Sequence, residues 1–350
     1  MLAVMQITER CDLRCHYCYL PPASARDMPL ALALRTIDRL VDIARSQKVK
    51  DPVSICFHGG EPTLVLARVA RVMAYARRRG INDFIIATNG AGLDRKMVDY
   101  IVANRISIIM SVDGVAPAHD HQRVFPDGRG SWRLVDRALD LLSEHADSWA
   151  AGLRRNPFRF RVTLTPASSV FLARTVRYLA AKPLARHGYI TLVPGNYPGA
   201  RWPEYKELLK LFRGQVEEIK GLFRECDLAG QPRPRVCLNE CLGAASTSLG
   251  YLTATQAEPF CGPGEQVMGV SIDGRIYACH LRAVNCQEKD NDLYCVGTVQ
   301  KGLSQPLQDG LFTVLGRNPK CSCLYWNARE SGLPETPVRA SAALYEAWCS

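Results

Sequence analysis

The 350-residue chain has none of the features that place a protein in a membrane or direct it out of the cell. No apolar run approaches the ~18–20 residues that a membrane-spanning helix needs. The first eight residues lack the basic segment and the small-residue cleavage site of a secretory signal. Internal repeats, low-complexity tracts and nucleic-acid-binding motifs are absent as well. These absences predict a globular cytoplasmic protein, in which cysteines stay reduced.

Cysteine, in contrast, is plentiful, since the chain has 14 of them. In a reducing compartment so many cysteines favour metal binding over disulfides. Three lie in the run Glu9–Tyr19 with the spacing CxxxCxxC, at Cys11, Cys15 and Cys18. Ten others follow residue 225, and Cys56 sits alone in an apolar run that is typical of a buried core thiol.

The spacing of the first three cysteines predicts an iron–sulfur site. Three thiolates on one short loop can ligate three irons of a [4Fe–4S] cube and leave the fourth iron without a protein ligand. An open coordination position is typical of a reactive metal, whereas structural zinc takes four ligands, usually as two close pairs. Zinc binding is the alternative, and it fits the spacing less well.

The chain is basic, with a net charge of +10 and local runs at Arg77–Arg79 and Arg154–Arg155. Such a charge could attract a polyanion or an acidic peptide. The simpler interpretation is a solvated basic surface, because no motif for nucleic-acid binding accompanies it. Nucleic acid is therefore not predicted as a partner.

Short β-branched apolar runs alternate with helical periodicity from residue 1 to about residue 222. In the first helical stretch Leu30, Leu34 and Ile37 recur at steps typical of an amphipathic helix. This alternation predicts an α/β fold with a parallel sheet and right-handed crossovers, here a partial (β/α)6 TIM-like barrel. Ligand sites of parallel sheets lie at the carboxyl ends of the strands. The predicted strands are 3–7, 53–57, 84–87, 106–111, 158–165 and 190–193, and the predicted helices are 29–47, 64–79, 93–103, 131–146, 168–182 and 203–223.

The pattern changes after about residue 225, where cysteines, glycines and short strands replace the alternation. Strands are predicted at 266–272 and 275–279, and Asp273-Gly274 between them is a strong hairpin signal. The sequence therefore predicts two domains, a barrel over residues 1–225 and a cysteine-rich domain over residues 226–350.

Three motifs follow predicted strand ends. Phe57–Thr63 contains two adjacent glycines, which let the backbone approach a ligand closely, and Glu61, whose carboxylate suits a cationic group. Ala87–Gly90 and Ser111–Gly114 each supply small polar groups and a flexible glycine. Without further context the first motif is also a tight turn capped by its glutamate. The others are common turn chemistry, in which Asp113 is expected to stabilise the turn.

Two arginines and three histidines near the strand ends have both a functional and a structural interpretation. Arg123 could fork onto a carboxylate with two parallel hydrogen bonds, or could be a surface arginine. Arg161, on the fifth predicted strand, would need a partner if buried, and a substrate or cofactor is a candidate. For His58, His119 and His121 a hydrogen-bonded structural role is the favoured interpretation.

Two of these motifs resemble those of the radical S-adenosylmethionine (SAM) superfamily. They are the cysteine loop, with Tyr17 directly before its third cysteine, and the run Gly59-Gly60-Glu61-Pro62. The resemblance implies that SAM chelates the open iron of the [4Fe–4S] cluster and is cleaved by one electron, supplied by a donor such as flavodoxin or ferredoxin. The product is a 5′-deoxyadenosyl radical, which takes a hydrogen atom from the substrate. The resemblance implies cofactor contacts at Tyr17, Gly59, Gly60, Glu61, Thr88, Asn89, Ser111, Arg123, Arg161 and Val193.

Cys261 and Cys279, spaced as Cys-x12-Gly-x4-Cys across the predicted hairpin, resemble the opening of a SPASM or twitch domain. That resemblance implies at least one auxiliary [4Fe–4S] cluster, with Cys261, Cys279 and one or both of Cys321 and Cys323 as ligands. A full SPASM domain continues with a denser cysteine run, from which this chain departs. Ligands for a second auxiliary cluster would come from Cys226, Cys237, Cys241, Cys286, Cys295 and Cys349.

Family members with SPASM or twitch extensions mostly modify peptides or proteins, so the resemblance implies a ribosomal peptide maturase of the peptide-modifying, sulfatase-maturase-like branch. The predicted reaction is a side-chain cross-link, of the carbon–carbon or cyclophane type, in a ribosomally synthesised precursor peptide. The alternatives are oxidation of a protein Cys or Ser, radical chemistry on a small molecule, and a non-catalytic Fe–S or zinc module. Because the chain begins almost at the cluster loop, a separate peptide-recognition protein or direct leader binding is expected.

Overall fold

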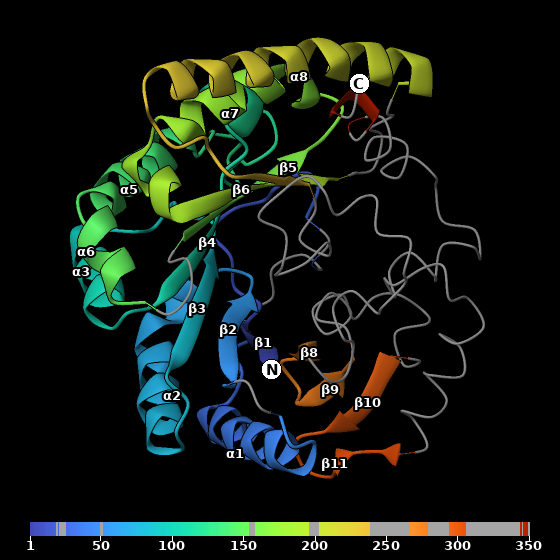
Figure 1. Ribbon diagram of the computed structural model, residues 1–350. Coiled ribbons are helices and arrows are strands. Elements are labelled where there is room, and N and C mark those ends of the chain that lie inside the picture. Colours follow the sequence, from blue (N-terminus) through green and yellow to red (C-terminus); the bar gives the residue numbers. More distant parts are fainter. Residues whose placement is uncertain are drawn as a thin grey trace. The chain divides into compact units, whose positions relative to one another are not determined.

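Two compact units make up the chain. A computed structural model describes residues 1–18, 20, 26–49, 52–153, 158–195, 203–238, 267–278, 294–305, 344 and 346–348 (Figure 1). By packing, the first unit comprises Met1–Cys11, Tyr19–Thr88 and Thr253–Gly332. The second comprises Asp12–Cys18, Asn89–Leu252 and Leu333–Ser350. The domain division at residue 225 stays a prediction.

The first unit is built on parallel strands joined by helices. Its N-terminal elements are β1 (Leu2–Thr8), α1 (Leu30–Ser46), β2 (Ser54–Gly59), the 3-10 turn η1 (Pro62–Val65), α2 (Leu66–Arg78) and β3 (Asp83–Thr88). Strand β2 pairs in parallel with β1 on one side and with β3 on the other. All residues of β1 after the first are buried, as is typical of a central parallel strand.

The predicted hairpin adds to the other edge of β1. Its strand β8 (Val267–Val270) pairs in parallel with β1, and β9 (Arg275–Tyr277), β10 (Cys295–Thr298) and β11 (Gly302–Leu303) continue the sheet with antiparallel pairing. The strand order in this unit is β11-β10-β9-β8-β1-β2-β3. Gly274 closes the turn with φ +84°, a conformation that favours glycine. The hairpin predicted from Asp273-Gly274 is confirmed.

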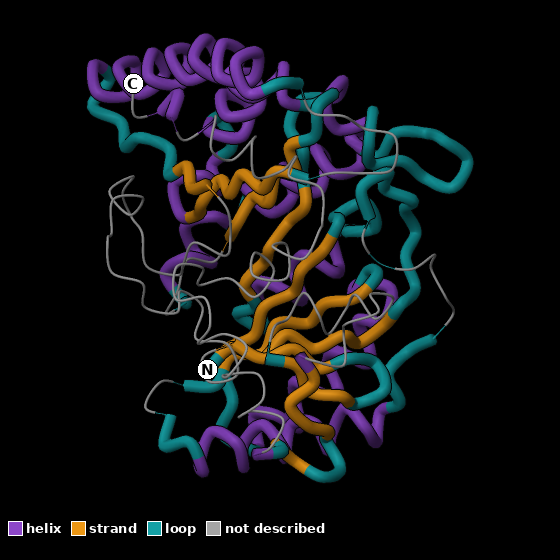
Figure 2. Tube along the Cα trace, turned by 90° about the vertical axis from the view of Figure 1, so that its right-hand side faces the viewer, coloured by secondary structure: helices purple, strands orange, loops and turns teal. Residues whose placement is uncertain are grey.

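The second unit has its own parallel strands, in the order β4-β5-β6-β7. Figure 1 shows its helices along one side of these strands, and Figure 2 draws the same chain with helices, strands and loops in separate colours. Along β5 the even-numbered residues are buried, and the odd-numbered ones lie on the opposite, less buried face. Its elements are α3 (Arg95–Ala103), β4 (Ser107–Ser111), α4 (Ala116–Asp120), α5 (Trp132–Ser143), α6 (Ala146–Ala151), β5 (Phe158–Leu164), η2 (Ser169–Phe171), α7 (Leu172–Ala180), η3 (Pro183–His187), β6 (Gly188–Pro194), α8 (Tyr205–Leu228) and β7 (Val236–Leu238).

The strand–helix alternation predicted up to residue 222 is confirmed, with element ends that differ by a few residues. It gives the predicted mixed α/β class, with the parallel sheet that is typical of a TIM-like partial barrel. The helices α4 and α6 are not predicted by the sequence, because five and six residues are too few to show a helical period. None of the described helices is long and apolar enough to cross a bilayer.

Candidate active site

The loop that carries the three N-terminal cysteines is closed at its base within the first unit. Met28 N donates to Ile7 O at 2.9 Å and Glu9 N donates to Arg26 O at 2.9 Å, so the outgoing chain lies beside the end of β1. The Arg26 guanidinium forks onto the Glu9 carboxylate at 2.7 and 2.5 Å. The Glu9 side chain is 4% exposed, so this ion pair is partly desolvated and stronger than a surface pair.

The stretch Asp12–Cys18 of the same loop packs within the second unit. Arg14 N donates to Val124 O at 2.7 Å and His16 N donates to Gln122 O at 2.9 Å. Alternate residues of the loop are thereby held against one segment, residues 122–124. This segment directly follows α4 and contains Arg123, one of the predicted SAM contacts.

The cysteines are reduced and accessible to different degrees. Cys11 and Cys15 are half-buried and Cys18 is exposed, and Cys18 N donates to Cys15 O at 3.0 Å in a tight turn. Burial raises the pKa of the Cys15 thiol, and the nearby Arg123 guanidinium opposes that rise. In the part of the chain that is described, no three His, Cys, Asp or Glu side chains gather as a metal site. The donor chemistry, three thiols on one anchored loop, fits a [4Fe–4S] cluster, and the ligand set stays a prediction.

Tyr17 reaches from this loop into a buried polar network of the second unit. Its hydroxyl donates to Asp113 Oδ2 at 2.6 Å and accepts a hydrogen bond from Arg123 Nη1. Gln122 Nε2 donates to the same Asp113 oxygen at 2.7 Å, and Thr163 N donates to Asp113 Oδ1 at 2.8 Å. Burial raises the pKa of Tyr17 well above its ordinary value, so the phenol keeps its proton.

Arg123 is the buried cation of this network. Its side chain is 7% exposed, and its Nη1 lies 3.9 Å from Asp113 Oδ2. Burial alone would lower its pKa, but Cys15, Tyr17 and Asp113 hold that pKa well above the ordinary value. Its Nε is buried and has no hydrogen-bond partner among the described residues. A buried charged donor without a partner is costly, which points to an anionic ligand in the working protein.

His119 confirms its structural interpretation. Its Nδ1 accepts from Asp113 N at 3.2 Å, and its Nε2 lies 3.0 Å from Ser131 Oγ, which donates to Arg123 O at 2.8 Å. Burial, and then the charge of Arg123, hold the pKa of His119 well below its ordinary value. The imidazole is therefore neutral in the folded protein.

The neutral His119 predicts a loss of stability in mild acid. The unfolded chain binds a proton at this histidine below about pH 6.5, whereas the folded chain does not, so stability falls as the pH drops below that value. Between pH 7.5 and 5.5 we expect the free energy of unfolding to fall by about 1 kcal/mol from this group. Denaturant midpoints of the wild type and His119→Gln should show a steeper pH slope for the wild type. The exposed His121, changed to Gln, is the control, and an equal slope in His119→Gln would contradict the prediction.

The glycine motif lies in the first unit, at a place where another backbone segment comes too close for any larger residue. A Cβ on Gly59, which has φ +141°, would lie 2.0 Å from Thr8 O, and one on Gly60 would lie 2.1 Å from Arg10 O. Gly60 N donates to Thr8 O at 2.8 Å and Glu61 N donates to Arg10 O at 2.7 Å. The glycines therefore let the end of β2 run against the chain that leaves β1 for the cysteine loop.

Glu61 caps the turn that follows these glycines. Its Oε1 accepts from Thr63 N at 3.1 Å, from Thr63 Oγ1 at 2.7 Å and from Thr88 Oγ1 at 2.7 Å, and the residue is 1% exposed. The capping interpretation is thereby present in the structure. Thr88, also a predicted site residue, lies against Glu61 at the end of β3. Contact of Glu61 with a cationic ligand stays a prediction.

Asn89 lies in the second unit and contacts the cysteine loop. Its Nδ2 donates to Asp12 Oδ1 at 2.7 Å, and its Oδ1 accepts from Ala91 N at 2.8 Å. Asp12 stands directly after Cys11 in the sequence. The asparagine thus fixes both its own turn and the first half of the loop.

The remaining predicted SAM contacts lie on neighbouring strands of the second unit. The β4–β5 register sets Ser111 beside Arg161, and the β5–β6 register sets Arg161 beside Thr191. Residues opposite each other in a parallel sheet project from the same face, so Ser111 and Arg161 are brought together. Val193 lies two residues after Thr191 on β6, opposite Thr163, and is half-buried.

The predicted auxiliary-cluster ligands Cys261, Cys279, Cys321 and Cys323 lie outside the described residues, and so do Cys241, Cys286 and Cys349. Cys226 lies in α8, Cys295 begins β10 and Cys237 lies in β7. The Cys295 thiol donates to Gly297 O at 3.4 Å. The auxiliary cluster therefore stays a prediction.

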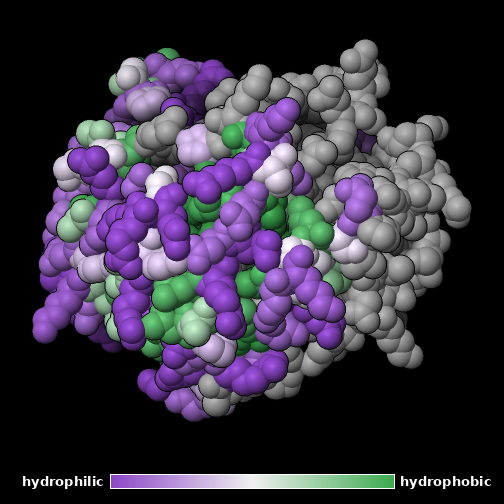
Figure 3. Space-filling model, turned by 90° about the horizontal axis from the view of Figure 1, so that it is seen from below, coloured by the Kyte–Doolittle hydropathy of each residue, from purple (hydrophilic) through white to green (hydrophobic). Residues whose placement is uncertain are grey.

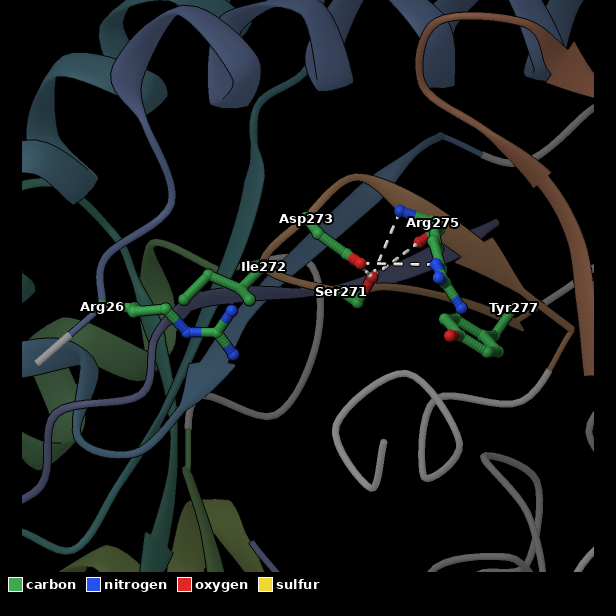
Figure 4. A pocket seen from close by; sticks show the side chains of 6 residues that line it. All are labelled: Arg26, Ser271, Ile272, Asp273, Arg275 and Tyr277. Atoms are coloured by element: carbon green, nitrogen blue, oxygen red, sulfur yellow. Dashed lines mark hydrogen bonds and ion pairs between the residues drawn. The ribbon is translucent and has the colours of Figure 1, made fainter. Parts of the chain in front are cut away.

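A small polar cavity lies at the hairpin of the first unit (Figure 4). It measures about 210 Å³ and is lined by Arg26, Ser271, Ile272, Asp273, Arg275 and Tyr277. Its charged groups have partners, since Arg26 pairs with Glu9, and Arg275 Nε lies 3.3 Å from Asp273 Oδ2. Burial raises the pKa of Tyr277 to about 12, which keeps its hydroxyl protonated.

Side chains of the basic run Arg77–Arg79 contact nearby residues of the first unit. Arg77 stacks over Phe84 at 5.4 Å, and Arg79 Nε lies 2.9 Å from Asp38 Oδ1. The face drawn in Figure 3 shows hydrophilic side chains between smaller apolar areas. These contacts favour the solvated-surface interpretation of this run. Arg154–Arg155 lies outside the described residues.

Sequence reasoning missed Asp12 and Gln122 as parts of the site. Asp12 stands between two cysteines of the motif, which is a usable signal. Gln122 has no such signal in the sequence. It belongs to the site because its side chain donates to Asp113 and to the backbone of Thr163, and only folding brings these residues together. Asp113 was expected to stabilise a turn, and the structure adds its bond to Tyr17 of the cysteine loop.

The chain is similar in sequence to several known proteins. GTP 3′,8-cyclase 2 of Mycobacterium tuberculosis is 31% identical over 166 residues, which cover 47% of this chain and 42% of the cyclase. The chain spans about half the length of the curated relatives it matches.

Among solved structures, native anSMEcpe with bound AdoMet and the Kp18Cys peptide has a similar fold, with a TM-score of 0.71, 17% identity, and coverage of 99% of this chain and 96% of that chain. SuiB of Streptococcus suis has a TM-score of 0.59 with 15% identity, over 96% of this chain and 75% of that one. The sequence model of the radical SAM superfamily matches residues 5–149, which include the cysteine loop, the glycine motif and Arg123. Residues 5–149 of this chain are therefore similar in sequence to the radical SAM superfamily.

Proposed function

We propose that this protein is a radical SAM enzyme that modifies a peptide. The observation that carries the proposal is Arg123, a buried guanidinium held beside the turn of Cys15 and Cys18, whose Nε has no hydrogen-bond partner within the described ranges. A cluster and SAM, when bound, would supply the 5′-deoxyadenosyl radical that takes a hydrogen atom from the substrate. The cluster would be held by Cys11 together with the two cysteines of that turn.

The chain's own residues have distinct roles in this proposal. Arg123 would bind the SAM carboxylate, because a guanidinium can fork onto it and its Nε needs an acceptor. Glu61 would bind the SAM amino group while it also caps η1. The other predicted contacts, at Tyr17, Gly59, Gly60, Thr88, Asn89, Ser111, Arg161 and Val193, would line the SAM and substrate site.

A peptide substrate is supported by the fold. Native anSMEcpe was solved with AdoMet and a peptide, and SuiB was solved bound to the precursor peptide SuiA. We propose a side-chain cross-link in a ribosomally made precursor, with an auxiliary [4Fe–4S] cluster on Cys261, Cys279 and one or both of Cys321 and Cys323. A flavodoxin or ferredoxin would donate the electron, and a separate protein would present the peptide. A cytoplasmic location is part of the proposal, because reduced thiols are needed to ligate the clusters.

A small-molecule substrate is the second candidate. It is favoured by the cyclase of Mycobacterium tuberculosis, whose name states a nucleotide reaction and which is 31% identical over 47% of this chain. The peptide proposal is preferred because the fold likeness to anSMEcpe covers nearly the whole of both chains.

The test is the formation of 5′-deoxyadenosine. The anaerobically reconstituted protein, with SAM and dithionite, is expected to release it, and a substrate peptide encoded beside the gene is expected to lose two mass units per cross-link. No 5′-deoxyadenosine from a fully cluster-loaded sample would overturn the radical SAM proposal. Its formation with no peptide change, but with a new small-molecule product, would favour the second candidate.

The variant Arg123→Lys should show whether SAM binding needs only the positive charge at this position or also the planar guanidinium. Lysine keeps a cation near Asp113 but cannot form the planar fork, so we expect the affinity for SAM to fall by a factor of about 10 to 100. Equilibrium dialysis with labelled SAM measures this. Arg129, an exposed arginine on the same segment that pairs with Asp127, is the control as Arg129→Lys. Equal SAM affinities in both variants would contradict the role of Arg123.

A further inference from the structure

A single buried carboxylate joins the cysteine loop to Arg123. Asp113 is 1% exposed and lies just past the end of β4. One of its oxygens accepts from Tyr17 of the loop at 2.6 Å and from Gln122 at 2.7 Å, and the other accepts from Thr163 N of β5 at 2.8 Å. The carboxylate is thereby fixed from strand β5 and from the segment after α4, and it holds the loop in turn.

Tyr17 lies between Cys15 and Cys18 in the sequence, so what fixes its ring also fixes the backbone between two predicted cluster ligands. Its hydroxyl also accepts a hydrogen bond from Arg123, whose Nη1 lies 3.9 Å from the Asp113 carboxylate. With Nη1 engaged on this side, the guanidinium is oriented and its Nε is left for another acceptor. Asp113 thus contacts the Cys15–Cys18 turn through Tyr17 and also faces the cation, in addition to the backbone bonds that hold the loop at Arg14 and His16.

We propose that Asp113 is a positioning residue, which holds the Cys15–Cys18 turn through Tyr17 and orients Arg123 toward the carboxylate of SAM. The part that concerns SAM rests on the proposed function, and the hold on the loop does not. Asp113 itself has no contact with the reacting atoms in this proposal. Its replacement should therefore change loop dynamics and SAM affinity rather than the chemistry of the cluster.

The chain offers a matched control for Asp113→Asn. Asp136 in the same unit also bridges a tyrosine and a cation, since it accepts from Tyr178 at 2.5 Å and from Lys182 at 2.6 Å. These partners lie in α7 and just beyond it, and none belongs to the cysteine loop. Asp136→Asn thus removes an acid from a similar triad and reports what structural damage alone does.

Four measurements on the reconstituted protein test the proposal: hydrogen exchange of the loop, iron content, SAM affinity and the spin-resonance spectrum of the reduced cluster. Hydrogen exchange should accelerate about tenfold or more for the amides of Arg14 and His16 in Asp113→Asn, and Tyr17→Phe should do the same to a smaller extent. In Asp113→Asn the iron content should stay at the wild-type level, and the SAM affinity should fall about tenfold. The change that SAM causes in the spin-resonance spectrum of the reduced cluster should also become smaller in this variant. Asp136→Asn should leave the loop exchange, the iron content, the SAM affinity and the spectrum as in the wild type.

The outcomes are distinct. Unchanged loop exchange in both Asp113→Asn and Tyr17→Phe would overturn the positioning role, whatever the wild type does with SAM. Equal effects of Asp113→Asn and Asp136→Asn would overturn it as well, since they would reveal general destabilisation. Faster loop exchange in a protein whose wild type binds no SAM would support the hold on the loop and reject the proposed function instead.

Discussion

A variant in which Cys11, Cys15 and Cys18 are all changed to Ala should lose about four irons per chain and all formation of 5′-deoxyadenosine. The reason is that these thiols are the only predicted ligands of the SAM-binding cluster, and alanine supplies no replacement donor. The measurement is iron and sulfide analysis of anaerobically reconstituted protein, beside the wild type. The irons that remain in the variant would belong to the cysteines after residue 225.

The control for this variant is Cys56→Ala, which removes a buried thiol in β2 that lies outside the loop. It should keep the full iron content, with only a modest loss of stability from the small cavity. If the triple variant kept its iron, or if zinc replaced iron throughout the wild type, the cluster assignment would be wrong. A metal-binding module without radical chemistry would then be the leading interpretation.

Gly59→Ala should be among the most destabilising single substitutions in the first unit. The added Cβ would lie 2.0 Å from Thr8 O, a backbone atom that cannot move without shifting β1, and φ +141° is unfavourable for alanine. We expect a loss of more than about 3 kcal/mol in the free energy of unfolding, measured by denaturant titration. Because Thr8 leads into the cysteine loop, cluster content after reconstitution should fall as well.

Two further glycines separate the causes of this effect. Gly60→Ala adds a clash at 2.1 Å with Arg10 O without a positive φ. Gly80→Ala has φ +86° and meets no atom within 4 Å, so it reports the backbone cost alone, about 1 kcal/mol. A Gly59→Ala variant no less stable than Gly80→Ala would show that the close approach of β2 to the loop is absent in solution.

Local sequence signals were sufficient for the longer helices, for the parallel strands up to β6 and for the β8–β9 hairpin. The alternation of buried and less buried residues along β5 and the helical period of α1 are patterns among residues that are close in sequence. The same holds for Asp273-Gly274, whose turn preference acts within four residues. Short helices such as α4 escaped prediction, because one turn carries no period.

The contacts that assemble the site could not be predicted in this way. Asp113 meets Tyr17 across 96 residues, and Thr163 across 50. Nothing in the run Ser111–Gly114 distinguishes such an acid from one that only closes its own turn. Likewise the pairing of Glu61 with Thr88 depends on the β2–β3 register.

The sequence by itself determined the donor set of the cysteine loop, the strand–helix alternation and the glycines that a close approach requires, because each depends on neighbours along the chain. Only the tertiary structure decided that Arg123 is buried with an Nε that has no partner among the described residues, that Glu61 also accepts from Thr88, and that Asp113 joins the loop to Arg123. Burial and hydrogen-bond partners are set by which distant segments pack together, and packing energy has no signature in a short stretch of residues.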